Sequence, residues 1–527
     1  MADGRLIRPP PMCHCPAATT TSRPRREQRP STLLPTAAQS GARLPTRRHA
    51  DGSRGRCGTA GVPRRPRRGP RSPDRRLYRD DPRTEGIMDS SQPGNPTGTT
   101  RPTPRPARPR PVPKPVRRLR PEAKPAPVRV MHFSDTNLPR RDGIVTSTRT
   151  LLGSLVDQGH QSVLVVPHHP SQGSERGVLT LDSVPCGVAA LRLVLPRAAH
   201  VDQLAGWAPD VVHVHTPGPA GLLGIMTARR LGVPVVHTYH TDLHAYAEAY
   251  RAPSAALRLM LRMYARRLDR PVPKVGRGRN AKRALIDAVN ELLLEDAGAV
   301  VVPTPAILER TTLSVPEDRM FVAPAAVSRP SLDADAAADF RRRWSIPERA
   351  PVVLFVGRVN REKGVDLLVP AFERVAAELP DARLVLVGAV YQKRELRRML
   401  KRHGIADRTH VLGEQPADEV AAAYAACDVF AFPSQSDTQG LVLQEAALAG
   451  RPAVLVDPAL HTSNAVANAF ELTEPSPDAF ADRTVDLLRA PERSAAIGAR
   501  ARERAAAHTT ASYASTMVDI YRHVLAD

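Results

Sequence analysis

The feature that most constrains the fold of this chain is a series of short apolar runs separated by segments long enough for helices. The runs are 162–166, 211–214, 233–237 and 299–302 in the first half, and 352–356, 383–387, 410–412, 429–432 and 453–456 in the second. Strands buried on both faces read as short hydrophobic runs, as in parallel sheets covered by helices. The series therefore predicts an α/β protein with two doubly wound, Rossmann-like domains.

The first 128 residues differ in composition from the rest of the chain. They contain 29 Lys and Arg against 9 Asp and Glu, and they hold 25 of the 53 prolines. Without apolar periodicity, such a segment cannot offset the entropy lost on folding. We therefore expect residues 1–128 to form a disordered basic tail.

A basic tail suits nucleic acid or an anionic membrane. However, Tyr78 is the tail's only aromatic residue for stacking on bases, and no apolar run is long enough for a signal peptide or membrane span. We expect no nucleic-acid partner. Part of the tail is also dispensable if Met88 or Met131, not Met1, is the true start.

The segment from Phe430 to Val454 reads as a strand, a polar loop and a helix. The turn at 438–441 places free backbone amides at the helix N-terminus, which favours phosphate. Asp437 and Glu445 lie on either side of this turn, and carboxylates accept hydrogen bonds from sugar hydroxyls. The pattern suits a nucleotide-activated sugar, and the alternative is an ordinary strand–loop–helix with surface acids.

A second motif follows the apolar strand at 352–356. Gly357 permits close backbone approach, and Arg358 and Lys363 supply two cations for a diphosphate. The alternative is a strand end followed by a solvated basic loop.

Together these two segments resemble the retaining glycosyltransferases of family four, which have the two-domain GT-B architecture. The resemblance implies that Glu445 holds the ribose, Asp437 the donor sugar, and Arg358 and Lys363 the diphosphate. Asp437 stands where the family has glutamate. Members of this architecture generally need no metal, so we expect no cofactor, the nucleotide sugar being a substrate.

The resemblance extends to about residues 129–455. His240, in the run HTYHTD at 237–242, matches a strand end that lies at the catalytic centre in the family. The loop 136–143 ends in Asp142-Gly143 where the family has two glycines. The implied catalytic residues are His240, Asp437, Arg358 and Lys363, and the implied donor-binding residues are Gly143, Gly357, Gly440, Leu441, Val442 and Glu445.

The resemblance also divides the chain. We expect an acceptor-side domain at 129–326, a nucleotide-sugar-binding domain at 327–510, and a terminal helix at 511–527 that packs back on the first domain. Five histidines are dense enough to suggest zinc, but no second shell is evident and we expect no metal. They are His213, His215, His237, His240 and His244, of which we expect His213 and His237 to be hydrogen-bonded structural residues.

Residues 251–283 carry 11 Lys and Arg and one acid. Arg258, Arg262 and Arg266 recur every four residues, so 254–270 predicts a basic amphipathic helix that binds anionic lipid. The alternative is a solvated helix whose apolar side is ordinary core. Sparse cysteines, such as Cys186 and Cys427, indicate a reducing cytoplasm, so the expected location is the cytoplasm, at the inner face of the cell membrane.

Three segments depart from the family pattern around the donor pocket. Ala325-Ala326 replaces Asn-Gly, 389–392 lacks the glycine-rich loop, and 458–473 lacks the usual glycines. The expected function is transfer of a hexose, mannose or glucose, from a UDP- or GDP-sugar to an acceptor hydroxyl with retention, with a lipid at the cytoplasmic membrane face among the acceptors. The alternative is a non-catalytic GT-B-like protein that binds nucleotide sugar or membrane.

Overall fold

The computed structural model describes residues 126–526 except 137, 139–141, 187–191, 245–246, 248–252, 277, 279, 312 and 329–334. The predicted tail therefore lies outside the described residues up to position 125, together with the candidate start Met88. Met131, the other candidate start, is fully buried inside the first strand.

The first domain is built on a seven-stranded parallel sheet with the order β3-β2-β1-β6-β7-β8-β9. The strands are β1 (Arg129–Phe133), β2 (Gln161–Pro167), β3 (Val178–Leu181), β6 (Val211–Val214), β7 (Val235–Thr238), β8 (Ala297–Val302) and β9 (Met320–Val322), and β4 (Ser183–Pro185) and β5 (Arg192–Val194) form a separate antiparallel pair. The predicted strands of the first half are all present, with ends shifted by no more than two residues.

The second domain is built on a six-stranded parallel sheet with the order β12-β11-β10-β13-β14-β15. The strands are β10 (Val352–Val356), β11 (Arg383–Val387), β12 (Thr409–Gly413), β13 (Val429–Phe432), β14 (Ala453–Leu455) and β15 (Glu471–Leu472). This two-sheet architecture confirms the predicted α/β fold class.

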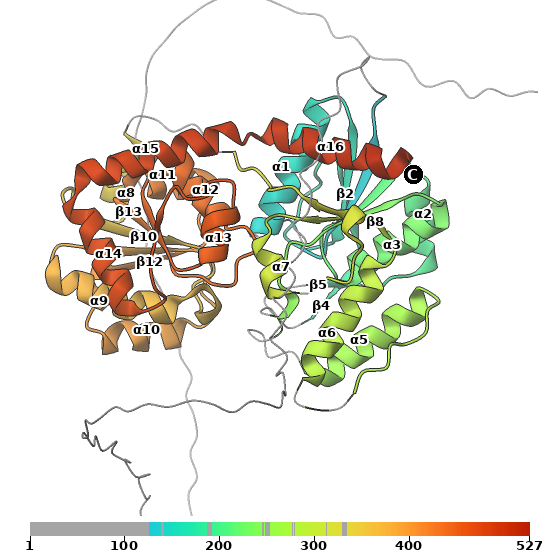
Figure 1. Cartoon of the computed structure of the whole chain (residues 1–527), viewed down its shortest axis with the longest axis horizontal. Coiled ribbons are helices and arrows are strands. Elements are labelled where there is room, and N and C mark those ends of the chain that lie inside the picture. The colour runs from blue at the N-terminus through green and yellow to red at the C-terminus, as the bar shows by residue number, and fades with distance from the viewer. Residues whose placement is uncertain are drawn as a thin grey trace, which may run out of the picture. The chain divides into compact units, whose positions relative to one another are not determined.

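Helices lie between the successive strands of the two parallel sheets, except between β2 and β3 (Figure 1). The first domain has α1 (Gly143–Asp157), α2 (Ala198–Ala205), α3 (Pro219–Leu231), α5 (Ser254–Arg267), α6 (Ala281–Leu294), α7 (Ala306–Arg310) and the 3₁₀ helix η1 (Glu317–Arg319). Those after it are α8 (Ala336–Arg343), η2 (Arg361–Lys363), α9 (Val365–Glu378), α10 (Lys393–Arg402), η3 (Ala406–Arg408), α11 (Ala417–Ala426), α12 (Leu441–Leu448), α13 (Pro458–Ser463), α14 (Pro477–Arg489), α15 (Pro491–Ala507) and α16 (Thr510–Ala526). In the described part of the chain, no helix combines the length and the apolar character that a membrane span requires.

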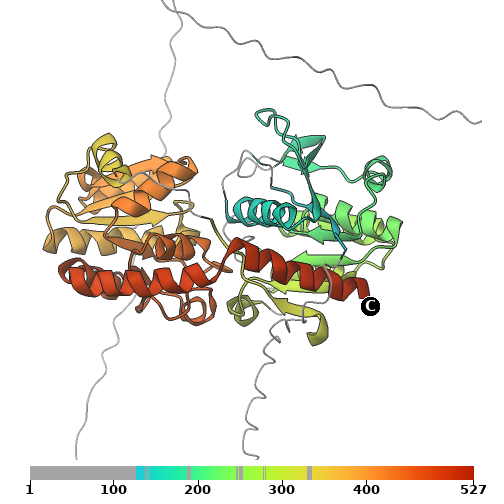
Figure 2. The ribbon, with the colours of Figure 1, turned by 90° about the horizontal axis from the view of Figure 1, so that it is seen from above.

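The C-terminal helix α16 packs on the first domain although it follows the second in sequence. Figures 1 and 2 show it lying beside α1. Its Tyr513, Met517 and Tyr521 are buried in one cluster with Val130 and Leu151. Burying an apolar side chain of this size stabilises the fold by about 1.5–3 kcal/mol, so this face of the first sheet depends on the end of the chain.

Candidate active site

The two second-domain motifs meet because β10 and β13 are neighbouring parallel strands. Polar residues that follow such strands gather at the carboxyl edge of the sheet. Gly364 brings the two loops into direct backbone contact, since its φ is +78° and a Cβ there would collide with the carbonyl of Pro433. This contact sets Lys363 beside the loop that carries Asp437.

The two cations expected at the diphosphate are held in a network of ion pairs. Lys363 Nζ lies 2.8 Å from Asp437 Oδ1 and 3.8 Å from Glu362 Oε1, while Arg358 Nη2 lies 2.7 Å from the same Glu362 oxygen. Burial raises the pKa of Asp437, but the charges of Lys363 and Arg358 and the hydrogen bonds from Lys363 and Ser434 together outweigh it, and the net pKa is lowered. Both carboxylates therefore neutralise cations that the sequence assigned to phosphate.

Gly440, Leu441 and Val442 lie at the N-terminus of α12, where the helix offers backbone donors. Gly440 is the residue before the helix and has φ of +68°. The first amides of a helix have no intrahelical acceptor, and the amide of Leu443 bonds the carbonyl of Gly440 at 2.9 Å. The amides of Leu441 and Val442 are thus suited to an anion.

Glu445 lies one turn into α12 and is held by Tyr424 of α11. The Tyr424 hydroxyl donates to Glu445 Oε2 at 2.9 Å. Burial raises the pKa of the Glu445 carboxyl to about 7, against the lowering effect of this hydrogen bond. The carboxyl group is therefore available in either protonation state near neutral pH.

His240 and Gly143 bring the first domain to this site. The carbonyl of His240 accepts a hydrogen bond from Thr438 Oγ1 at 2.7 Å, and Thr304 Oγ1 donates to the carbonyl of Thr438 at 2.5 Å. A Cβ on Gly143 would lie 3.5 Å from Leu441 Cδ1. The structure therefore places Gly143 beside Leu441 and the backbone of His240 beside the loop that carries Asp437, while Gly357 directly follows β10.

Several further contacts to the 437–439 loop were not foreseen. Arg310 donates to the carbonyl of Asp437 at 2.6 Å and forms an ion pair with Asp457. The side-chain amide of Gln439 bonds both the N–H and the carbonyl of Ala325, at 3.1 and 2.5 Å. These partners are more than 100 residues apart in sequence, and no local pattern signals them.

Two aspartates at or beside departures from the family pattern cap helices. Asp142, in place of a glycine, caps α1 by accepting a hydrogen bond from the amide of Val145 at 3.1 Å. Asp457, before the segment without glycines, caps α13 by accepting from Leu460 at 3.1 Å. Side-chain caps of this kind stabilise a helix by about 1 kcal/mol.

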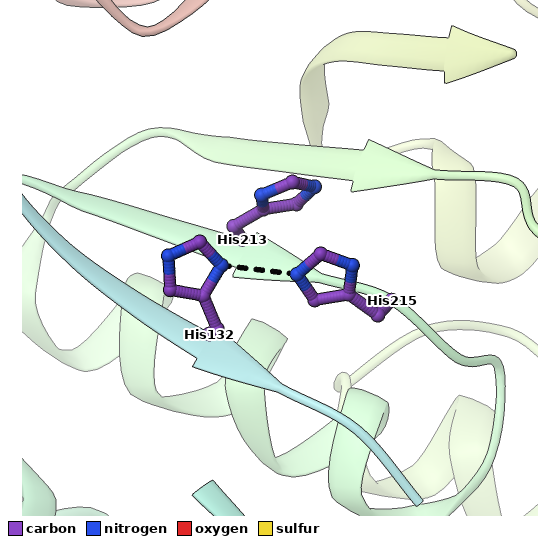
Figure 3. Close-up of side chains that lie close together, drawn as sticks. All are labelled: His132, His213 and His215. Carbon is purple, nitrogen blue, oxygen red and sulfur yellow. Dashed lines mark hydrogen bonds between the residues drawn. The ribbon is translucent and has the colours of Figure 1, made fainter. Parts of the chain in front are cut away.

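His132, which was not among the candidate histidines, joins His213 and His215 in a buried cluster. In the sheet register His132 lies opposite His213, and side-chain nitrogens of His132, His213 and His215 all lie within 4.8 Å of one another (Figure 3). His213 has the structural role expected of it, because Nδ1 lies 2.8 Å from Tyr521 Oη and Nε2 lies 2.7 Å from Thr238 Oγ1.

The hydrogen bonds of His213 oppose metal binding by the histidine cluster. To bind an ion, His213 would have to lose one of its two hydroxyl partners, so the ring is not free for coordination. For His237 the expectation was wrong at one atom, since Nδ1 has no hydrogen-bond partner among the described residues. His244 bonds Asp287 at 2.8 Å, away from this cluster.

Two family models match successive parts of the chain. The model described as Glycosyltransferase Family 4 matches residues 141–329, and the one described as Glycosyl transferases group 1 matches residues 337–504. The first covers every strand of the first sheet except β1, and the second covers the whole second sheet.

Curated relatives and a solved structure agree with these models. A GDP-mannose-dependent alpha-mannosyltransferase of Mycobacterium tuberculosis is 30% identical over 341 residues, covering 63% of this chain and 79% of that protein. An alpha-monoglucosyldiacylglycerol synthase of Streptococcus pneumoniae is 24% identical over 336 residues, covering 62% and 70%. The structure of sucrose-phosphate synthase from Thermosynechococcus elongatus matches with a TM-score of 0.56 and 20% identity, covering 76% of this chain and 99% of that one. The chain therefore belongs to the group 1 glycosyl transferases of family four, with the two-domain GT-B fold.

Proposed function

We propose that the chain transfers a hexosyl group from a UDP- or GDP-sugar to an acceptor hydroxyl with retention of configuration. The observation that supports it most is the convergence of Arg358, Lys363 and the N-terminal amides of α12 beside Glu445. Two cations and a helix N-terminus suit a diphosphate, and the Glu445 carboxylate suits the ribose hydroxyls.

Charge stabilisation of the leaving group is the main catalytic contribution of these residues. When the bond between the sugar and the diphosphate breaks, negative charge grows on the phosphate oxygens, and preorganised donors stabilise it. Arg358 and Lys363 bind the diphosphate in exchange for their resting partners Glu362 and Asp437. Asp437 and His240 orient the sugar, and the acceptor hydroxyl attacks from the face that the diphosphate leaves.

The relatives narrow the donor and acceptor classes. One similar protein is named for GDP-mannose, and another is a synthase of a glucosylated diacylglycerol. We propose mannose or glucose as the sugar and a lipid hydroxyl as the acceptor.

A thermal-shift panel of UDP-, GDP- and ADP-sugars tests the donor site. A ligand at 100 times its Kd stabilises the protein by about 2.7 kcal/mol, which is roughly 5–10 °C for a domain of about 200 residues. We expect such a shift with one nucleotide, its loss in Arg358→Ala, and its retention in Arg361→Ala. Arg361 is the matched control because it lies in the same loop but is exposed. No shift with any nucleotide would overturn the proposal and would leave only the membrane-binding form of the non-catalytic GT-B-like alternative.

Helix α5 supports an anionic membrane surface as a partner. Leu261 and Tyr264 of its inner face are buried in the core of the first domain, so this part of its apolar side is ordinary core. Its outer face nevertheless exposes Leu259 and Met263, at 57% and 47% of their surface, next to the exposed Arg262. Apolar side chains among arginines are typical of helices that lie on anionic lipid, and we propose that α5 docks at the inner face of the cell membrane.

Vesicle binding tests this surface. We expect the triple change of Arg258, Arg262 and Arg266 to Gln to weaken binding to vesicles with anionic lipid, at about 1 kcal/mol for each arginine near the surface. The matched control changes Arg394, Arg398 and Arg402, which form a stripe of the same spacing along exposed positions of α10. Equal loss in both triple variants would show that only net charge matters and would remove α5 as a docking surface.

A further inference from the structure

Three histidines form a hydrogen-bonded chain that runs from inside the first sheet to His240. His132 Nδ1 lies 3.0 Å from His215 Nε2 (Figure 3), and His215 Nδ1 lies 3.0 Å from His240 Nε2. The rings stack in sequence, with centroids 5.2 and 5.3 Å apart and planes inclined by 23° and 22°. The three histidines meet because β1, β6 and β7 are neighbours, with His132 near the end of β1 and His215 and His240 just after β6 and β7.

All three rings are neutral near physiological pH. Burial lowers the pKa of His132 to about 3 and that of His240 to about 4, and it holds the pKa of His215 well below its ordinary value. A neutral imidazole has one N–H and one bare nitrogen. Each hydrogen bond between two rings needs one N–H and one bare nitrogen. The three N–H groups must therefore all point in the same direction along the series His132, His215 and His240.

His132, the innermost of the three histidines, determines that direction. His132 Nε2 is buried and has no hydrogen-bond partner among the described residues. If the N–H groups pointed inward, this nitrogen would carry a buried proton with no acceptor, and orphaned buried N–H groups are rare in native proteins. If they point outward, His132 donates through Nδ1, His215 donates through Nδ1, and Nε2 of His132 is simply bare.

We infer that His132 and His215 are positioning residues that hold His240 as the tautomer protonated at Nδ1, so that His240 faces the donor sugar as a hydrogen-bond donor. This inference rests on the proposed function, in which His240 meets the sugar. Nε2 of His240 is occupied by His215, and its Nδ1 carries the proton. In this state His240 stabilises an oxygen that gains negative charge, and it does not remove a proton from the acceptor.

Histidine ¹⁵N spectra of the full chain test the tautomer without any activity measurement. Long-range ¹H–¹⁵N correlations distinguish a protonated ring nitrogen from a bare one, and the signals of His240 are assigned by their loss in His240→Gln. We expect Nδ1 of His240 to be protonated and Nε2 bare at pH 7.5. A proton on Nε2, or a mixture of the two forms, would overturn the inference.

Two substitutions of His132 test by kinetics whether the hydrogen-bonded relay of His132, His215 and His240 orients His240. Asn retains a donor at the position of Nδ1 and Leu does not, and thermal melting of both variants checks that they fold. We expect His132→Asn to keep kcat within about twofold and His132→Leu to lower it by at least about tenfold, since outright loss of a donor to developing charge costs about 10²–10³ in kcat. Affinity for the free nucleoside diphosphate should not change in either variant.

His213→Asn is the control for disturbance of the same buried cluster. His213 bonds Tyr521 and Thr238 and takes no part in the hydrogen bonds that join His132, His215 and His240. The His240 spectrum should therefore be unaltered in this variant. Equal kinetic losses in His132→Asn and His132→Leu would overturn the relay. A wild-type chain without transferase activity would refute the proposed function, and the ¹⁵N spectra would still decide the tautomer.

Discussion

Replacement of Glu445 by Gln should make the protein more stable at pH 8 while it weakens the donor site. Burial raises the pKa of the Glu445 carboxyl from 4.5 to about 7, so above pH 7 the folded protein holds a desolvated negative charge. Gln has nearly the same shape and can still accept the hydrogen bond from Tyr424, but it carries no charge. The variant therefore removes the free-energy cost of a buried charge at position 445 and keeps the packing around it.

The size of the effect follows from the pKa. A rise from 4.5 to about 7 corresponds to about 3 kcal/mol, at about 1.4 kcal/mol for each pH unit. Because the folded-state pKa is the higher one, the stability from this carboxyl is fully present below pH 4.5 and is lost as the pH rises through 7. For a domain of about 200 residues, 3 kcal/mol amounts to roughly 6–12 °C in Tm.

The assay is thermal melting of wild type and Glu445→Gln at pH 4.5, 6 and 8. We expect the two Tm values to agree at pH 4.5 and the variant to melt higher at pH 8, by up to that amount. Glu395→Gln, which removes an exposed carboxylate of α10, should follow the wild type at every pH. A constant difference between wild type and Glu445→Gln across the range would refute the reasoning. At pH 8 nucleotide binding by Glu445→Gln should weaken by about 1–3 kcal/mol, as expected for a lost charged hydrogen-bond acceptor.

Two further changes test the geometry around the site. Gly440→Ala should lower the free energy of unfolding by about 1–3 kcal/mol, because φ is +68° and the new Cβ would lie 3.1 Å from Leu443 Cδ1. Denaturant unfolding measures this loss, and an unchanged midpoint would show that the turn adapts without strain. Tyr521→Phe should lower the free energy of unfolding by about 1–3 kcal/mol, because it leaves the buried Nδ1 of His213 without its partner at 2.8 Å. Urea unfolding measures this loss, and a more stable variant would show that Tyr521 of α16 does not stabilise the fold through His213.

The central strands were predictable because their apolar signal is local. The strand Val352–Val356 is almost wholly buried and reads as an uninterrupted apolar run. In contrast, β3 at the edge of the first sheet buries only Leu181 fully, and β15 has two residues. Edge strands face solvent on one side and need no apolar run, so hydrophobic periodicity missed these two, although it found the edge strand β12.

The placement of the candidate site residues was predictable for the same reason. Arg358, Lys363, Asp437 and Glu445 each lie within a strand–loop–helix segment that a sequence shows directly. Their partners were not predictable, because they come from other elements. Tyr424 of α11 is the example, since only the packing of α11 against α12 brings its hydroxyl to 2.9 Å from the Glu445 carboxyl.

The resting ion pairs explain how the site keeps two cations without a ligand. A partly buried charge is costly unless it is paired, and Arg358 and Lys363 have side-chain exposures of only 23% and 15%. Glu362 and Asp437 provide the missing charge. Aspartate at position 437, where the family has glutamate, still reaches Lys363 at 2.8 Å. Under the proposed function, an incoming diphosphate would replace these carboxylates as the partner of each cation, and Asp437 would then be released beside the expected position of the sugar hydroxyls.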